Sequence, residues 1–220
     1  MAEPTASTAG AAAHAAADKF DAKRAAEYDR QSRIALAGYE AMHELTARCL
    51  AAALGTGTEK SLLIVGVGTG QEIATIGRHQ QRWRFTAIDP SAAMIRFAET
   101  RLADLGLLHD RTTLRACHVS ELPDAAYDGA TLIGVLHHIH GDGAKADLLR
   151  EIAARLKPGA PFVLGGNYRA YDSEPLLLAA WQERWRLYGA TGAELAEKFG
   201  RITQDVDPPA SEEAVIDLMR

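Results

Sequence analysis

The sequence has little that would tie the protein to nucleic acid or to an oxidising compartment. Its formal net charge is −5, and lysine and arginine form no continuous stripe, which argues against a nucleic-acid backbone as a partner. Only two cysteines are present, Cys49 and Cys117. They form neither a CxxC metal or redox motif nor a disulfide framework, and we expect both to be small core residues.

The sequence also lacks the apolar segments that membranes and secretion require. No apolar run reaches the roughly 18–20 residues that span a bilayer. The first residues, MAEPTASTAGAAAHAAADKF, contain neither the basic region nor the leucine-rich core of a signal peptide. We therefore expect a cytoplasmic protein without a membrane partner. Residues 1–17 are rich in alanine and low in complexity, so we expect a flexible tail there.

What the middle of the chain does contain is an alternation of short apolar runs and amphipathic segments. The runs predict strands and the segments predict helices. We expect strands in SLLIVGVGTG (61–70) and at 83–89, 112–119, 128–136 and 161–167, with helices at 71–79, 91–106 and 142–156. Ser91 suits the N-cap of the second helix and Gly106 its C-terminal stop. The alternation predicts a Rossmann-like α/β fold with a mostly parallel sheet and helices on both faces.

Both flanks of this core read as helical. Residues 20–53 are charged and apolar at helical spacing, and residues 174–220 also show a wholly helical pattern. In the N-terminal segment a shared helix face is expected for Ile34, Met42, Leu45, Cys49 and Leu50. We predict a tail at 1–17, an N-terminal helical cap at 18–58, a ligand-binding core at 59–173 and C-terminal helices at 174–220 that serve as a lid or a dimer element.

The most informative segment is a glycine turn, Gly66-Val67-Gly68-Thr69-Gly70. A strand that enters such a turn and then a helix lets backbone approach a ligand closely, and the helix N-terminus favours anionic groups. The next strand ends in Asp89, where folds of this type hold ribose hydroxyls. A dinucleotide fingerprint would need glycine at position 71, which is Gln71, and the turn is not followed by the Gly-Lys-Ser/Thr of a P-loop.

Four stretches in this order carry a specific resemblance: LLIVGVGTGQE, FTAIDPSAAMIRFAETRL, HVSELPDAAYDGATLIGVLHHI and LLREIAARLKPGAPFVLGG. Together they resemble the class I S-adenosyl-L-methionine (SAM)-dependent methyltransferases, and the bacterial members that act on small molecules look most similar. The resemblance implies SAM as the cofactor, S-adenosyl-L-homocysteine (SAH) as its product, and methyl transfer to a small-molecule acceptor.

The resemblance also implies roles by position. The glycines of the turn would line the methionyl part of SAM, and Asp89 would accept hydrogen bonds from the ribose. Tyr28 looks like the N-terminal tyrosine that closes over the cofactor in several members. The remaining implied contacts are Pro90, Met94 and Val119 around the adenine, and Gly134 and Val135 beside the sulfonium.

The sequence departs from the family pattern at three places. An acidic residue often stands two positions before the first glycine, where this chain has Ile64; Glu72, which starts the next helix, is expected to take over its role toward the ammonium group of SAM. Asp often ends the third strand, where this chain has His118, whose neutral imidazole can accept a hydrogen bond from adenine. The family usually adds two further strands after a last helix, and here the sequence stops at EEAVIDLMR (212–220).

Residues that follow the fourth and fifth strands are candidates for acting on the acceptor. His137 and His138 are candidate general bases, since unperturbed histidine titrates near pH 6.5; the alternative is that they are ordinary packing residues of the loop. Arg169 is a candidate for holding a carboxylate, with Tyr171 beside it. Trp181 belongs to an aromatic stripe that would form an acceptor pocket, a dimer seam or core. No metal site is predicted.

Three functions therefore remain open from the sequence. The first is a methyltransferase that acts on a small molecule, mainly by proximity and orientation. The second is a non-catalytic SAM-binding protein or partner subunit, and the third is a SAM-using enzyme that does not methylate. A homodimer through residues 174–204 is compatible with each.

Overall fold

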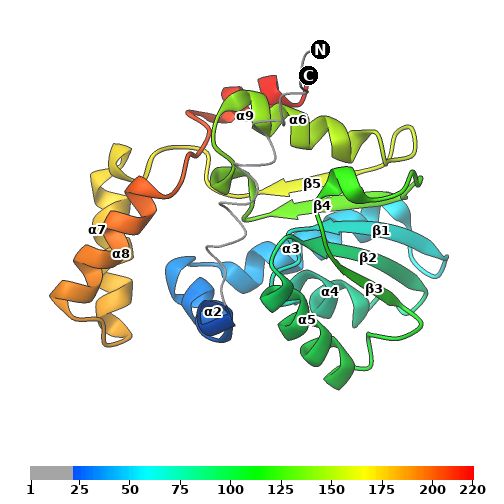
Figure 1. Ribbon diagram of the computed structural model, residues 1–220, viewed down its shortest axis with the longest axis horizontal. Helices are drawn as coiled ribbons and strands as arrows, with labels where there is room; N and C mark the ends of the chain where they lie inside the picture. The colour runs from blue at the N-terminus through cyan, green and yellow to red at the C-terminus, as the bar shows by residue number, and fades with distance from the viewer. Residues whose placement is uncertain (1–21) are drawn as a thin grey trace, which may run out of the picture.

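The computed structural model describes residues 22–220, so the predicted tail at 1–17 lies outside the described residues. Five parallel strands form one sheet in the order β3-β2-β1-β4-β5 (Figure 1). The strands are β1 (Lys60–Val65), β2 (Trp83–Asp89), β3 (Thr112–Ala116), β4 (Gly129–Ile133) and β5 (Phe162–Gly165). This confirms the predicted fold class. The strand order reverses at β1, between β2 and β4, and ligands of open α/β sheets bind at the carboxyl ends of such strands.

Helices α4 (Gln71–Gly77), α5 (Ala92–Asp104) and α6 (Asp142–Ala153) connect the strands. Two strands end earlier than predicted because the chain turns into short 3-10 segments, η1 (Val119–Glu121) after β3 and η2 (Leu136–His138) after β4. Gly134 has a φ of +70°, a left-handed conformation that favours glycine and that ends β4. The predicted caps of α5 are confirmed: Ser91 Oγ accepts from Met94 N at 3.4 Å, and Leu107 N donates to Leu102 O at 2.8 Å beyond Gly106.

The central strands β1 and β4 are buried on both faces, as their continuous apolar sequences predict, whereas the edge strand β3 is largely exposed. Successive residues of β1 point to opposite sides, so Leu62 and Ile64 belong to one core cluster and Leu63 and Val65 to the other. The first cluster contains residues of α4, α5 and the N-terminal helix α3 (Tyr39–Leu54), and the second contains residues of α6. The central strand therefore anchors the glycine turn between two packed layers.

The N-terminal helices differ in one respect from the prediction. Helix α2 (Ala22–Ala35) and α3 are separated by a break at Gly38, whose φ is +87°. Leu50 is fully buried, whereas Leu45 is 64% exposed and Cys49 is exposed, so the predicted common face is wrong. Helix α3 instead buries the face that carries His43, Ala47 and Leu50. At about 100° per residue, Leu45 and Leu50 point about 140° apart around the helix axis, so one narrow face cannot hold both. Cys117 is half-buried, so neither cysteine belongs to the fully buried core.

The C-terminal helices α7 (Pro175–Leu187) and α8 (Gly192–Gln204) pack beside α2, beyond the ends of β4 and β5 (Figure 1). Ile34 of α2 shares a small buried cluster with Trp185 and Leu195. The guanidinium of Arg184 also donates to the carbonyl oxygens of Arg33 and Ile34, both at 2.8 Å, which satisfies carbonyls at the C-terminal end of α2. These three helices therefore form one connected cover, which we call the helical cover.

The chain continues through η3 (Tyr171–Ser173) before α7 and ends with α9 (Glu212–Leu218) against α6. In residues 166–220 no strand follows β5. Of the helices in residues 22–220, none combines the length and the apolar character needed to cross a bilayer.

The orientation of α3 predicts a large difference between two leucines of the same helix. Leu50→Ala should lower the free energy of unfolding by about 2–5 kcal/mol, because it removes a fully buried side chain and leaves a cavity. Leu45→Ala, at an exposed position, should change it by less than about 0.5 kcal/mol. Urea unfolding followed by circular dichroism measures both. A loss at Leu45 as large as the loss at Leu50 would contradict this orientation.

Candidate functional site

A cavity of about 340 Å³ lies at the carboxyl ends of β1 and β4 and extends under the helical cover. Its lining comes from the glycine turn, from the residues after β4 and β5, and from α2, α3, α7 and α8. The lining includes Tyr28, Tyr39, His43, Gly66, Gly68, Gln71, Glu72, Gly134, His137, His138, Tyr171, Trp181, Trp185, Lys198 and Arg201. Residues far apart in the sequence therefore meet at the switch point of the sheet.

The glycine turn has the backbone conformation that its composition predicts. Gly66, Gly68 and Gly70 all have positive φ values, of +73°, +52° and +84°. A Cβ on Gly66 would overlap the side chain of Val135, so no other residue fits there without a shift. Gly70 is the N-cap of α4, which directs the amide groups of the first helical turn toward the cavity side of the sheet.

Asp89 connects this turn to the tip of β2. Its Oδ2 accepts from Gly68 N at 3.1 Å and its Oδ1 accepts from Ser91 N at 2.9 Å. Burial raises the pKa of the Asp89 carboxyl, while the two backbone hydrogen bonds lower it in part. Each carboxylate oxygen has a second lone pair, so the group can accept further hydrogen bonds.

Tyr28 of α2 lies where the cavity meets the first turn of α5. It lines the cavity and packs against Ala93 and Met94, and its ring lies 3.6 Å from where a Cβ on Gly68 would stand. Burial raises the pKa of its hydroxyl. Seven predicted cofactor contacts are not among the cavity-lining residues: Gly70, Asp89, Pro90, Met94, His118, Val119 and Val135. Of these, Val135 lies beside Gly66.

Glu72 is buried and directed into the sheet. Thr131 donates a hydrogen bond to its Oε1 at 2.8 Å, and Thr131 pairs in register with Ile64. Glu72 therefore contacts the residue that pairs with Ile64, the position at which related sequences often have an acidic residue. Burial, and to a smaller extent the charge of Asp89, raise the pKa of Glu72 to about 8 against the opposing hydrogen bond from Thr131.

An ionic latch holds α2 against the glycine turn and α5, and sequence reasoning did not identify it. Asp29 Oδ1 accepts from Thr69 Oγ1 at 2.9 Å and from Arg101 at 3.1 Å, and Asp29 also pairs with Arg33. Burial opposes ionisation of Asp29, but these partners outweigh it and lower its pKa. Gln71 joins the latch by accepting from both arginines.

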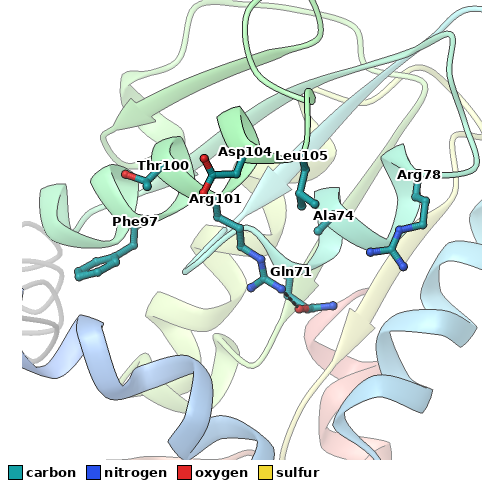
Figure 2. Close-up of a pocket in the computed structure, with 8 residues that line it drawn as sticks. All are labelled: Gln71, Ala74, Arg78, Phe97, Thr100, Arg101, Asp104 and Leu105. Atoms are coloured by element: carbon teal, nitrogen blue, oxygen red, sulfur yellow. Dashed lines mark hydrogen bonds between the residues drawn. The ribbon is translucent and has the colours of Figure 1, made fainter.

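A shallow groove of about 370 Å³ lies beside this latch, between α4 and α5. Figure 2 shows the guanidinium of Arg101 reaching Gln71 in the groove, with Arg78 and Phe97 to the two sides. Gln71 also lines the larger cavity. Since the donors of Arg101 already serve Gln71 and Asp29, we regard the groove as the outer side of the latch.

The two candidate bases lie side by side on η2. His137 and His138 both line the cavity, with ring centroids 4.1 Å apart. The linker between α8 and α9 supports their loop: Asp207 N donates to His137 O at 2.8 Å, and Asp207 Oδ2 accepts from Gly141 N at 2.7 Å and from Lys145 Nζ at 2.6 Å. Lys145 is buried and also pairs with Asp142 at 3.7 Å, so its contact with Asp207 fixes the loop between β4 and α6.

The cover side of the cavity contains some predicted acceptor residues and several that were missed. Tyr171 and Trp181 line it as predicted, but Arg169 does not; it pairs with Glu174 on the surface. Trp185, of the same aromatic stripe as Trp181, also lines it, whereas the missed residues include Tyr39, His43, Lys198 and Arg201. Burial lowers the pKa of His43 to about 4, so its imidazole is neutral at physiological pH. The Lys198–Arg201 spacing on a predicted helix was the one signal available for the two cations.

Within residues 22–220 no group of three or more His, Cys, Asp or Glu side chains is arranged to hold a metal ion. The groups that the site offers to a ligand are instead hydrogen-bond acceptors, buried carboxylates and aromatic rings. They suit an organic ligand with hydroxyl and cationic groups.

Comparison with known proteins finds similarity to methyltransferases over the core. Residues 63–162 match a family model described as a methyltransferase domain. The structure of a proposed SAM-dependent methyltransferase from Methanococcus maripaludis has a TM-score of 0.58 at 19% identity, and the match covers 96% of this chain and 99% of that one. No curated protein sequence matches the chain.

Two further solved structures share the fold over most of this chain. A proposed O-methyltransferase from Nostoc punctiforme has a TM-score of 0.58 at 14% identity and covers 80% of this chain. Geranyl diphosphate C-methyltransferase from Streptomyces coelicolor, solved with Mg²⁺, geranyl diphosphate and SAH, has a TM-score of 0.54 at 18% identity and also covers 80%. The chain spans 48% and 59% of these two proteins, and 43% and 32% of two other relatives.

The raised pKa of Glu72 predicts how stability depends on pH. The folded protein holds a proton on Glu72 that the unfolded chain releases at its ordinary pKa near 4.5. The stabilisation is therefore complete below about pH 4.5 and is lost as pH rises to about 8. Relative to Glu72→Gln, the wild type should lose unfolding free energy over this interval, measured by urea unfolding. Glu44→Gln, at an exposed position of α3, is the control. Parallel pH profiles for wild type and Glu72→Gln would contradict the burial of this carboxyl.

Proposed function

We propose that the protein transfers a methyl group from SAM to a small-molecule acceptor, because residues 63–162 match the model of a methyltransferase domain and the chain shares its fold with a proposed SAM-dependent methyltransferase. The observation that carries the proposal is the glycine turn held by Asp89 at the switch point of the sheet. A neutral turn alone would serve many ligands. A carboxylate that accepts hydrogen bonds, next to a turn whose glycines let a ligand approach closely, suits a ligand with ribose hydroxyls at one end and an amino-acid chain at the other.

The residues of the site fit SAM in three ways. The positive φ values of Gly66 and Gly68 leave backbone without side chains next to the cavity, where a methionyl chain can approach. The free lone pairs of Asp89 suit the ribose hydroxyls. Glu72 supplies a buried carboxyl on the cavity wall for the cationic groups of the cofactor, and this supports its role in place of an acidic residue at Ile64.

SAM, when bound, supplies an electrophilic methyl group on a sulfonium, so the protein mainly has to align the acceptor with it. The helical cover contributes by enclosing the cavity and excluding water. Gly134, at the end of β4, and Gly66 would border the reacting centre from the sheet side. Val135 packs against Gly66 and would fix the spacing between these two turns.

Access to the adenosine half of the site depends on Tyr28. Pro90, Met94, His118 and Val119 are proposed to surround the adenine, and Tyr28 lies between Met94 and the cavity. The tyrosine therefore has to shift with α2 for the cofactor to reach Asp89. The latch at Asp29 is made of hydrogen bonds and ion pairs that are partly exposed, and such contacts exchange readily with water.

His137 and His138 are proposed as general bases that remove a proton from a methyl acceptor that binds in its protonated form. Their loop follows β4, next to Gly134, and Asp207 and Lys145 hold it in place. An acceptor that is already a nucleophile would need no base. In that case the two histidines act as packing and hydrogen-bonding residues of the cavity wall.

Calorimetric titration with SAM and SAH tests the cofactor site. We expect binding by the wild type and a loss of affinity of about a hundredfold in Asp89→Ala, because two hydrogen bonds to a charged group, each contributing about 1.5 kcal/mol or more, disappear. The matched control is Asp104→Ala, at an exposed aspartate of α5. Thermal unfolding of each variant checks that the fold is retained.

The outcomes separate the open functions. Binding followed by transfer of labelled methyl from SAM to compounds of a metabolite extract supports the methyltransferase. Binding without any transfer leaves a non-catalytic SAM-binding protein, and a chemically altered SAM that copurifies, seen by mass spectrometry, indicates an enzyme that does not methylate. Wild-type protein that binds neither SAM nor SAH contradicts the proposal.

Binding of SAM should also release a proton. Glu72, with a pKa of about 8, is mostly protonated at about pH 7, and a cationic group placed beside it favours the carboxylate. We expect up to about one proton per SAM at this pH, and an affinity that increases as pH rises toward 8. Calorimetry in buffers of different ionisation enthalpy measures the proton count. The release should vanish in Glu72→Gln; equal release by wild type and this variant would show that another group titrates.

A further inference from the structure

Two cations of α8 line the cavity from the helical cover, one half-buried and the other with a side chain that is 43% exposed. Lys198 and Arg201 stand three residues apart, on one face of the helix, and both line the cavity. Glu72 is the carboxylate among the cavity-lining residues, and it lies on the sheet side. The cavity therefore has a protonated carboxyl on the sheet side, beside the glycine turn, and two cations under the helical cover.

The ammonium group of Lys198 contacts an aromatic ring of the protein but forms no ion pair with a described carboxylate. Its Nζ lies 3.9 Å from the centroid of the Trp185 ring. Between Glu27 and Arg220, where side chains are described, no hydrogen bond or ion pair joins this ammonium group to a carboxylate. A half-buried cation on an aromatic face remains attractive to an anion. Burial, together with the charge of Arg201, lowers its pKa, which a bound anion would reverse.

Arg201 is also available to a ligand. It pairs with Glu197 one helical turn earlier, and that carboxylate is 65% exposed. Exposed pairs of this kind contribute only about 0–1 kcal/mol, and a guanidinium has five N–H donors in a planar fork. The remaining donors can bind an oxyanion without breaking a strong internal contact.

The wall next to these cations is aromatic. Trp181 and Trp185 of α7 meet edge to face at 6.0 Å, and Tyr171 lines the same part of the cavity. Rings of this kind bind flat apolar groups through area burial and stacking. Cations beside aromatic rings together favour a ligand with an apolar, ring-like body and an anionic group.

SAM itself has an anionic group, the carboxylate of its methionyl part, which competes with the acceptor as a partner for these two cations. The residues proposed for SAM, Gly66, Gly68 and Asp89, lie at the edge of the sheet, so the cofactor is bound from that side. Lys198 and Arg201 lie on the cover, which reaches the cavity from the opposite side. These cations are therefore available to the second ligand, the acceptor.

We propose that the acceptor is an apolar, ring-containing small molecule with an oxyanion, carboxylate or phosphate, and that Lys198 and Arg201 bind this oxyanion. The inference rests on the proposed methyltransferase function and specifies its substrate class. Trp181, Trp185 and Tyr171 hold the ring. The oxyanion thereby anchors the far end of the acceptor and leaves its opposite end toward the glycine turn.

Matched probes test the proposal by calorimetry on protein saturated with SAH. Naphthalene-2-carboxylate is compared with naphthalene-2-carboxamide, and 2-naphthyl phosphate with 2-naphthol, so that each pair shares its ring. We expect the anion of at least one pair to bind about tenfold or more tightly than its neutral partner, as a charge-assisted contact predicts. Which pair shows the preference distinguishes a carboxylate site from a phosphate site.

Two double variants locate the preference. Lys198→Met with Arg201→Met should abolish it, while the Kd for SAH stays within about twofold, because the cofactor lies on the sheet side. The control, Arg169→Met with Arg186→Met, also removes two positive charges, but from surface ion pairs outside the cavity. This surface variant should keep the preference for the anion. If the first pair does not fold, Lys198→Gln and Arg201→Gln replace it singly.

The proposal is overturned if the wild type prefers neither anion over its neutral partner. It is also overturned if the variant with Lys198→Met and Arg201→Met keeps the preference, or if the variant with Arg169→Met and Arg186→Met loses it equally. A weaker SAH affinity in the cavity variant would instead assign the two cations to the cofactor. If the wild type binds no SAH, the methyltransferase proposal fails. The anion preference is then measured on the protein without SAH, where the same variants decide it.

Discussion

The hydrogen bond between Gly68 N and the Asp89 carboxylate is the contact on which the arrangement of the site depends. It joins the turn after β1 to the tip of β2, and through Ser91 N the same carboxylate reaches the start of α5. Three successive elements are thereby held together at the edge of the sheet where the strand order reverses. The turn can adopt this geometry because its glycines have positive φ values and Val135 fills the space beside Gly66. A buried carboxylate that accepts backbone amides is stabilised without a cation, which leaves it able to bind hydroxyl groups.

The helical cover is held to this rigid core by polar contacts more than by a large apolar interface. Asp29 reaches Thr69 of the glycine turn and Arg101 of α5, and Arg184 of α7 caps the end of α2. Its own apolar cluster is small. Ion pairs and hydrogen bonds in partly exposed positions contribute little net free energy and exchange with water. This combination suits a cover that has to admit and release ligands while the sheet and its turn remain unchanged.

Much of the fold, and the cofactor half of the site, could be predicted from local pattern. Strand β2 has the predicted bounds, Ser91 caps α5 as expected, and the Gly66–Gly70 turn precedes a helix. These features are short-range, because period, capping and left-handed glycines depend on neighbours along the chain. The prediction for α3 was wrong because the helix carries apolar residues on two faces, and only the face with Leu50 packs into the core. Leu45 and Cys49 therefore looked equivalent to Leu50 although only the last is buried.

By itself the sequence determined the parallel sheet, the glycine turn, and the acidic residue that follows it on the next strand, since each is encoded by residues within a few positions. Only the tertiary structure decided which side chains complete the cavity. It brought Glu72 under Thr131 beside Ile64, left Arg169 on the surface with Glu174, and placed Lys198 and Arg201 of α8 opposite the glycine turn. These relations join segments tens of residues apart, and they depend on how the cover helices rotate and dock on the sheet. Packing of whole elements sets that rotation, and no local spacing in the chain records it.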